Sequence, residues 1–486
     1  MRESWLKRFV EPVKRVRVAV RHFCNGVSWM SARLRVLSAS VLFMVFLPVC
    51  GFAPDVAPAP TADLIVTAAP IYNPLAALRP ASQSEERFPQ GARLLRIHEG
   101  KAEPLLKDFA ASADAQLSYD GEKVLFAGKK DAPDPWQIYE LTLKDGAVRR
   151  VQSAQTDLVR PFYLPAGRMV YARHGANGFQ LEAADLDGRN ITQLTFLPAS
   201  VLPSDVLQDG RILFEAGYPL GTGATPELFR VYSDGSGVDS YRCDHGQARW
   251  AGHQLASGDV VFTHGASLAR FTSAQAQEVS IVAPRAEYSG AIAETAEGAW
   301  LMSARSTPTT RYALKLWKPG ASALQTLLAM PDANLIEPVV IAAHTRPRRH
   351  PVSLHDWSYA NLLALNARES RNGELKTSPS EVRMEMLDAH GHVIITGKAP
   401  VEADGSFFVK AQGNAPIRFS LLDAKGNVLR QEHGWFWIRS GEQRICVGCH
   451  VGPERAPENN VPAVLLHTTT PVDLTGAKSE NSAEGK

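Results

Sequence analysis

Two cysteines and a histidine near the C-terminus of this 486-residue chain have a spacing that can do chemistry: Cys446-Val447-Gly448-Cys449-His450. Two thiols in a C-x-x-C arrangement can add across the two vinyl groups of one porphyrin, and a histidine that follows the second thiol can supply an axial nitrogen to the iron. The pentad therefore predicts one covalently attached c-type haem, with Cys446 and Cys449 as the attachment points and His450 as the proximal ligand.

Two other kinds of site use paired cysteines. A zinc site needs two further ligands at a suitable spacing, and the sequence has no second cysteine pair. A thioredoxin-like dithiol needs a βαβ context at the start of a helix, which the β-rich surroundings do not offer. Both remain weaker interpretations than haem.

The sequence does not identify the second axial ligand of the iron. A ligand there would suit electron transfer, whereas an open position would allow a small molecule to bind. The first candidate is His433, just before the pentad, and the others are His344, His350, His355, Met384 and Met386. Cys243-Asp244-His245 could also bind a metal, although a buried small thiol beside a turn is the favoured interpretation. The number of histidines in the propeller region is ordinary, so no function is expected for His174, His253 or His264.

The N-terminal segment predicts export. Residues 1–35 are rich in Lys and Arg, and residues 36–53 contain no charged side chain. A basic flank before a short apolar run is typical of a signal peptide or signal anchor, with the rest of the chain sent outward. We therefore expect the protein in the periplasm or on the outer face of a membrane, soluble, anchored through residues 1–53, or lipidated at Cys50.

A repeat runs through the middle of the chain. A turn with glycine precedes an apolar run at Gly121, Gly167, Gly210, Gly258 and Gly298. Units of about 40–50 residues with four short strands are typical of propeller blades. The segment 187–195 resembles the blades of TolB-like propellers. We expect an all-β fold with a six- or seven-bladed β-propeller over residues 85–345, in which residues 94–97 and 336–341 form a composite closing blade. A β-sandwich with accidental spacing is the alternative.

The flanking segments complete the predicted organisation. Residues 54–84 are expected to be a Pro- and Ala-rich linker, and residues 346–361 a second linker rich in Pro and Arg. Alternating strands then predict a β-sandwich-like domain over residues 362–466, which ends in the haem segment. The polar tail 467–486 is expected to be disordered.

Three stretches of this second domain carry a specific resemblance: 401–409, 421–426 and 441–450. They resemble the haem-bearing middle domain of the hydrazine synthase alpha subunit. The resemblance covers residues 362–466 closely and the propeller only in architecture. It implies the same roles for Cys446, Cys449 and His450. It does not imply hydrazine synthesis, because the alpha subunit of that enzyme carries a second haem-binding domain and this chain has no second C-x-x-C-H motif.

These observations favour an exported monohaem protein that passes electrons to or from a redox partner protein, with the propeller as docking platform. One alternative is a haem redox enzyme that acts on a small nitrogen or oxygen species. Another is a binding or scaffold protein in which the propeller does the work. The formal net charge of +2 gives no reason to expect a nucleic-acid partner.

Overall fold

A computed structural model describes residues 63–79, 85–217, 225–242, 246–273, 276–351, 353–370, 373–388, 390–432, 434–448 and 459–476. The predicted signal segment 1–53 lies outside these residues. Within the described ranges, no helix combines the length and the apolar character needed to cross a membrane.

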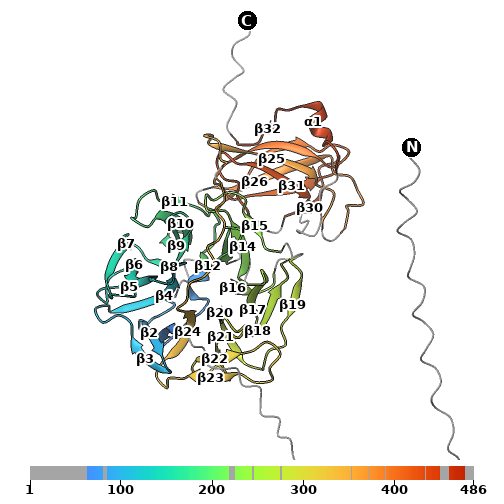
Figure 1. Cartoon of the computed structure of the whole chain (residues 1–486). Coiled ribbons are helices and arrows are strands. Elements are labelled where there is room, and N and C mark those ends of the chain that lie inside the picture. Colours follow the sequence, from blue (N-terminus) through green and yellow to red (C-terminus); the bar gives the residue numbers. More distant parts are fainter. Residues whose placement is uncertain are drawn as a thin grey trace, which may run out of the picture. The chain divides into compact units, whose positions relative to one another are not determined.

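Six four-stranded antiparallel sheets form a β-propeller (Figure 1). Blade 1 consists of β24 (Asn334–Val340), β1 (Leu64–Ala69), β2 (Arg93–His98) and β3 (Lys101–Pro104). Blade 2 consists of β4 (Ala111–Leu117), β5 (Lys123–Lys129), β6 (Gln137–Thr142) and β7 (Val148–Gln152). Blade 3 consists of β8 (Leu158–Leu164), β9 (Arg168–Gly175), β10 (Gly178–Asp185) and β11 (Thr192–Gln193).

Blades 4 to 6 follow the same order. Blade 4 consists of β12 (Val201–Val206), β13 (Ile212–Ala216), β14 (Glu227–Val231) and β15 (Asp239–Ser240). Blade 5 consists of β16 (Arg249–Gln254), β17 (Val260–His264), β18 (Ser267–Phe271) and β19 (Glu278–Ser280). Blade 6 consists of β20 (Glu287–Glu294), β21 (Trp300–Arg305), β22 (Ala313–Trp317) and β23 (Gln325–Leu328).

The second strand of a blade shows why the repeat was visible in the sequence. Val124, Leu125, Phe126 and Ala127 of β5 are all fully buried, as are the residues of β13. These strands have neighbouring blades on both faces, so they are almost entirely apolar instead of alternating, with Glu215 of β13 as an exception. The turn before each run needs a glycine with positive φ, and Gly210, at φ +87°, is one example.

The ring is closed by strands from both ends of the propeller sequence. β1 pairs with β24 through Ile65 and Val339, and with β2 through Val66 and Leu95. The predicted composite blade is confirmed, but the direct partner of β24 is β1, not the segment 94–97. Residues 64–69 lie in the range that we expected to be a linker. That expectation is wrong for them, because this run of buried apolar residues supplies the central strand of blade 1.

The second domain is a sandwich of two four-stranded sheets, β31-β25-β28-β32 and β27-β26-β29-β30. Its elements are β25 (Tyr359–Asn366), β26 (Glu381–Leu387), β27 (Val393–Pro400), β28 (Phe407–Gln412), β29 (Ile417–Leu422), β30 (Val428–Gln431), β31 (Gln443–Gly448), helix α1 (Ala463–His467) and β32 (Val472–Asp473). The core between the sheets is made by side chains such as Leu362, Met384, Val409 and Phe419.

Both boundaries of the sandwich differ from the predicted ones. β25 begins at Tyr359, inside the expected linker 346–361, and β32 lies inside the expected disordered tail. β32 pairs in parallel with β28 through Val472 and Val409, and Leu474 is 2% exposed in the sandwich core. One buried leucine and a two-residue strand order this part of the tail, and neither gives a periodic pattern.

Residues 342–350, which we call the strap, have no regular structure but have defined contacts with the propeller. The backbone N–H of His344 donates to the carbonyl of Tyr119 at 3.0 Å, and that of Arg348 to the carbonyl of Gln208, also at 3.0 Å. A Cβ atom at Gly210 would lie 2.2 Å from the Arg348 carbonyl oxygen, so this turn admits only glycine. The strap therefore follows the propeller surface.

Candidate functional site

The first cysteine of the pentad lies on β31, which is the outermost described strand of its sheet. β31 runs parallel to β25, with Cys446 beside Ala364 and Ile445 beside Leu363. Because side chains alternate along a strand, Arg444 and Cys446 share one face, and Ile445 and Val447 share the other. Ala364 is a core residue of the sandwich, so the face of Cys446 is the core-facing one.

The Cys446 thiol is free and half-buried, and it packs against the sandwich core. Burial raises the pKa of this thiol above its ordinary value, and the nearby Arg444 guanidinium opposes that shift. The carboxylates of Glu432, just after β30, and Asp239, on propeller strand β15, reinforce it. The neutral thiol is therefore the favoured form of Cys446 in this structure.

Arg444 connects the pentad to the propeller. Its Nη2 donates a hydrogen bond to the carbonyl of Val238. Its Nη1 is buried, lies 3.9 Å from Glu442 Oε1, and has no hydrogen-bond partner among the described residues. A buried guanidinium nitrogen without a partner has an unmet capacity to donate to an anion.

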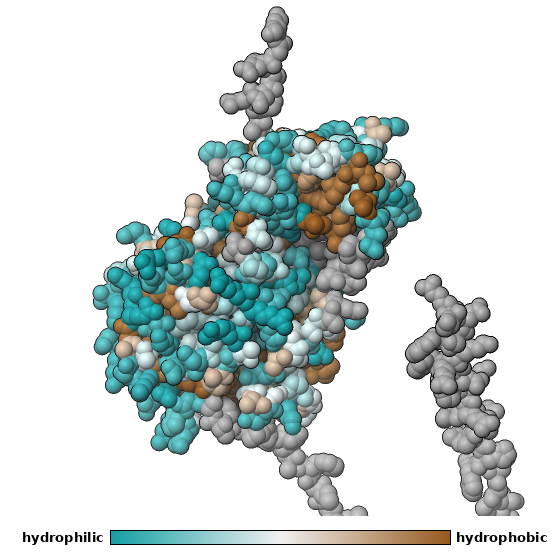
Figure 2. Space-filling view, turned by 45° about the horizontal axis from the view of Figure 1, so that its top comes forward, coloured by the Kyte–Doolittle hydropathy of each residue, from teal (hydrophilic) through white to brown (hydrophobic). Residues whose placement is uncertain are grey.

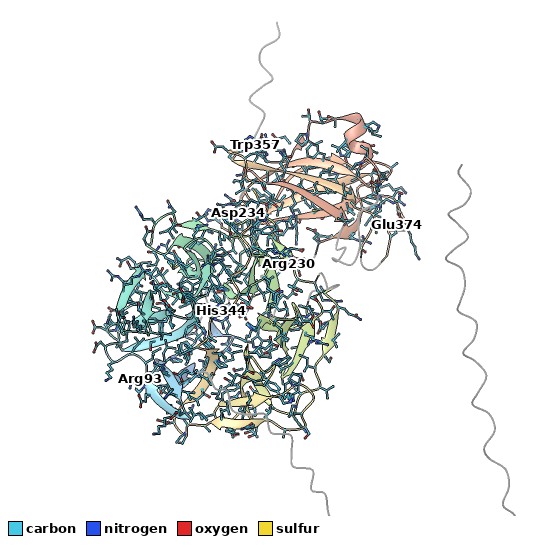
Figure 3. The ribbon with its side chains drawn as sticks, viewed as in Figure 1. Arg93, Arg230, Asp234, His344, Trp357 and Glu374 are labelled. Atoms are coloured by element: carbon cyan, nitrogen blue, oxygen red, sulfur yellow. The ribbon has the colours of Figure 1, made fainter. Side chains whose placement is uncertain are left out.

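The segment before β31 is anchored in the propeller. Trp437 is 0% exposed and belongs to the propeller core, and its Nε1 donates to the carbonyl of Gly235 at 3.1 Å. The Glu442 carboxylate accepts from the backbone N–H of Gly237 at 3.1 Å and from that of Arg439 at 2.8 Å. All these propeller atoms lie in the turn that begins at Asp234, labelled in Figure 3. One blade turn thus positions the strand that carries Cys446.

Apolar side chains are exposed on the sandwich. Figure 2 shows a brown patch on this domain. Eight of the eleven large hydrophobic residues that are exposed in the described structure belong to it: Val393, Ile394, Ile395, Val428, Ile445, Val461, Leu466 and Val472. Ile445, which is 64% exposed, directly precedes Cys446. Its side chain lies on the face of β31 opposite to the thiol, so the exposed apolar surface covers the outer side of this strand.

The other predicted site residues have different positions. Cys449, His450 and His433 lie outside the described residues, as do Cys243 and its neighbours 244 and 245. His350 stacks on Tyr232 of the propeller with ring centroids 3.6 Å apart. His355 stacks on Trp357 at 4.2 Å, and its Nε2 lies 2.9 Å from Gln443 Nε2.

The remaining ligand candidates divide between the two domains. Met384 is 0% exposed in the sandwich core, and Met386 packs against the same core, as Cys446 does. His344 lies on the propeller, with its ring 5.3 Å from that of Tyr119. The structure thus brings the two methionines into the core that Cys446 contacts, and it engages His344 and His350 in propeller contacts.

Sequence reasoning missed Arg444 and Trp437. Arg444 lies two residues before the first cysteine, which is the spacing that puts two side chains on one face of a strand. Trp437 belongs to the aromatic run Trp435-Phe436-Trp437, and such a cluster beside a chemical motif indicates a packed support. Both signals are visible in the sequence, but their propeller partners are not.

The residues around Cys446 fit a porphyrin. A thioether needs a reachable thiol, the ring needs apolar contacts, and its two carboxylates need cationic or hydrogen-bonding partners. The half-buried Cys446 thiol meets the first need, and the apolar core side chains that it packs against meet the second. The unpartnered Nη1 of Arg444 meets the third.

Comparison with known proteins found both a family-model match and solved structures of similar fold. Residues 365–451 match the family model of the hydrazine synthase alpha subunit middle domain. A structure of hydrazine synthase from Kuenenia stuttgartiensis has 15% identical residues and a TM-score of 0.72, covering 84% of this chain and 72% of that one. TolB from Acinetobacter baumannii has 14% identical residues and a TM-score of 0.44, covering 58% and 67%. No curated protein matches the chain.

The structural likeness extends over propeller and sandwich together, and at these identities it shows the fold. The family match is confined to the sandwich and includes the whole pentad. Over residues 365–451 the chain is therefore similar to the middle domain of the hydrazine synthase alpha subunit.

Proposed function

We propose that this chain is an exported monohaem c-type cytochrome-like protein that transfers electrons. The observation that carries the proposal is the position of Cys446, a free and half-buried thiol on an edge strand of the sandwich that leads into the rest of the C-x-x-C-H motif. The match to a family that the sequence resembles in its haem-bearing domain supports it.

The side chains of this chain would each have a defined role. Cys446 and Cys449 attach the haem, and His450 binds its iron. The Cys446 sulfur would form one thioether, and the Nη1 of Arg444, which makes no hydrogen bond within the described structure, would be available to a porphyrin carboxylate. When bound, the haem supplies an iron that gains and loses one electron reversibly.

The propeller is the docking platform in this proposal. Trp437, Glu442 and Arg444 all bond to the turn 235–238 of blade 4. A partner that docks on this blade would therefore find the haem strand at a fixed position. We propose a redox partner protein outside the cytoplasm, and attachment of this chain to the membrane through residues 1–53.

Covalent pigment tests the proposal directly. The full chain is produced in a host that matures c-type cytochromes, then denatured, and its absorption spectrum and mass are recorded. We expect one porphyrin per chain in the wild type and in Cys243→Ala, the matched control outside the pentad. Cys446→Ala/Cys449→Ala should have no covalent porphyrin. A wild-type chain without added porphyrin mass would refute the haem assignment.

Catalysis on a small nitrogen or oxygen species is the second candidate, favoured by the family of the 365–451 domain. The two functions differ in the coordination of the iron. A six-coordinate spectrum that does not change with CO or NO would support electron transfer. A high-spin iron that binds either gas would support catalysis, and the electron-transfer proposal would then be replaced.

A further inference from the structure

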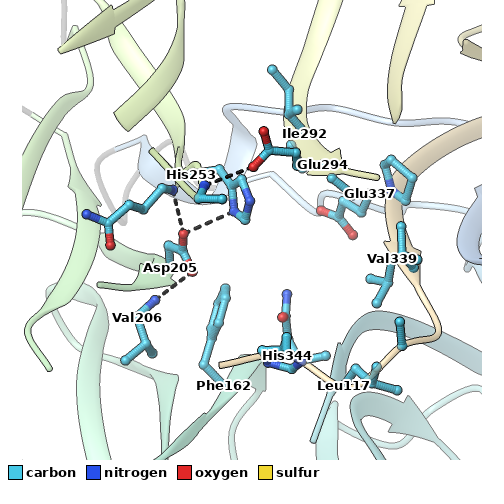
Figure 4. A pocket seen from close by; sticks show the side chains of 18 of the residues that line it. Leu117, Phe162, Asp205, Val206, His253, Ile292, Glu294, Glu337, Val339 and His344 are labelled. Carbon is cyan, nitrogen blue, oxygen red and sulfur yellow. Dashed lines mark hydrogen bonds and ion pairs between the residues drawn. The ribbon is translucent and has the colours of Figure 1, made fainter. Parts of the chain in front are cut away.

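The propeller contains a cavity of about 910 Å³ that the proposed haem chemistry does not use. It is lined by the first strands of blades 2 to 6 and by β24 of blade 1, and the strap contributes Ala342 to Thr345 and Pro347. Ligand cavities for small molecules have this size, and they combine apolar walls with a few fixed polar groups. Figure 4 shows the cavity from close by.

Buried charges form one side of this cavity. Arg87 is 6% exposed and donates to Asp114 at 2.8 Å and to Glu337 at 2.5 Å. Arg160 donates to Glu215, and its backbone N–H donates to Asp114 at 2.9 Å. Asp114, Arg160 and Glu337 all have positive φ, which costs a residue other than glycine about 1–3 kcal/mol and is concentrated at functional sites.

A histidine and a carboxylate are held in position elsewhere on the wall. Asp205 Oδ2 lies 3.0 Å from His253 Nδ1, and the same carboxylate accepts from the backbone N–H groups of Val206 and Gln254, both at 2.7 Å. Three bonds thus fix Asp205, which fixes the ring of His253. Figure 4 shows this pair together with Glu294, Glu337 and His344 around the cavity.

Glu294 differs from most of the other carboxylates of the cavity. Its Oε2 accepts from the backbone N–H of Ala256 at 2.8 Å, and it makes no ion pair with any residue of the described structure. Asp114 and Glu337 share arginines, and Asp205 has His253. Glu294 is half-buried, so an ammonium beside it would gain a charge-assisted hydrogen bond in partly dry surroundings.

The lining mixes polar side chains with apolar ones, and the partly exposed apolar ones include Phe162, Val206 and Val339. Five carboxylates line the cavity: Asp114, Asp205, Glu294, Glu297 and Glu337. Asp114 and Glu337 pair with Arg87, and Asp205 pairs with His253, so Glu294 and Glu297 are the two that make no ion pair within the described structure. Such a balance disfavours an anion and favours a cation. From Glu294, which makes no ion pair within the described structure, the apolar side chains of the lining and the volume together, we infer that the propeller cavity binds a small organic ammonium ion, with its charge on Glu294 and its apolar body against Phe162 and Val339.

Three probes of one shape test the inference on the full-length protein by isothermal titration calorimetry: benzylammonium, benzyl alcohol and benzoate. We expect benzylammonium to saturate one site per chain, and the other two to bind at least tenfold more weakly. Glu294→Gln should weaken benzylammonium at least tenfold. The matched control, Glu103→Gln on the exposed strand β3, removes the same charge and should leave the affinity unchanged.

Several results would overturn the inference. These are the absence of saturable benzylammonium binding, equal affinities for the three probes, or equal effects of Glu294→Gln and Glu103→Gln. If Glu294→Gln does not fold, the wild-type protein still tests the inference. A rising sodium chloride concentration should weaken the binding of benzylammonium and leave the binding of benzyl alcohol unchanged. The site is independent of the haem proposal, so Cys446→Ala should bind benzylammonium as the wild type does.

Discussion

The indole Nε1 of Trp437 donates a 3.1 Å hydrogen bond to the backbone carbonyl of Gly235, across 202 residues of sequence. Trp437 belongs to the segment that leads into β31, and Gly235 to a turn of blade 4. Phe196 and Phe214 of the propeller lie 6.1 and 6.4 Å from the Trp437 ring, centroid to centroid. The sandwich thus contributes a core residue to the propeller, which makes this tryptophan the best place to test the coupling of the two domains.

Trp437→Ala should lower the free energy of unfolding by about 3–5 kcal/mol, because it leaves a large cavity and removes a buried hydrogen bond. Guanidinium denaturation followed by tryptophan fluorescence and circular dichroism measures the loss. Ile395→Ala, on a side chain that is 62% exposed, is the control and should change stability by less than about 1 kcal/mol. Equal effects of the two substitutions would contradict the anchoring role.

Arg87→Ala should also cost about 3–5 kcal/mol, for an electrostatic reason. Asp114 and Glu337 would lose the buried guanidinium that lies within 2.8 and 2.5 Å of them. Arg189→Ala removes an arginine whose side chain is 81% exposed and pairs with Asp187, and it should cost less than about 1 kcal/mol. Urea denaturation compares the two. A similar loss for both would show that the Arg87 network does not stabilise the propeller.

We expect the stability of the protein to depend on pH through His253, and the direction of this dependence follows from its pKa. Burial alone would lower the pKa of His253, but Asp205 outweighs burial and raises it above the ordinary value of 6.5. The folded state then binds the proton more tightly than the unfolded state does. The resulting stabilisation is complete below about pH 6.5 and is lost as pH rises through the folded pKa.

The measurement compares the unfolding free energies of the wild type and His253→Gln over this pH range. Their difference should shrink as pH rises. In Asp205→Asn the burial of His253 lowers its pKa without the opposing Asp205 carboxylate. The contribution of His253 to the free energy of unfolding should then rise with pH, opposite to the wild type. A difference between wild type and His253→Gln that stays constant or grows with pH would refute this account of the pair.

Arg444→Gln tests the proposed haem environment. Loss of a positive charge beside the haem favours the oxidised iron, so the reduction potential should fall, by an energy on the order of 1 kcal/mol. A spectroelectrochemical titration of the haem-loaded protein gives the potential. Arg189→Gln removes the same charge far along the chain and is the control. An unchanged or higher potential in Arg444→Gln would exclude a role for this guanidinium at the haem.

Part of the fold of this protein can be predicted from local sequence alone. The repeated glycine turns and apolar runs predicted the blades because turn geometry and burial on both faces act within a few residues. The pentad predicts a haem site, because two thiols and an imidazole at that spacing suit one porphyrin. The strands β1 and β32 were missed, since they are single short segments whose partners, β24 and β28, lie far away in sequence.

The tertiary structure decided what surrounds these motifs. Three contacts form only when the whole chain has folded. Arg444 bonds to Val238, Trp437 enters the propeller core, and Asp205 pairs with His253 on the wall that also carries Glu294. Residue types and spacings do not predict such contacts, because the burial and the pairing of a side chain depend on a second segment that reaches it only after folding. Composition specified which groups were available, and only the closed ring and the packed sandwich determined which of them share a low-dielectric site.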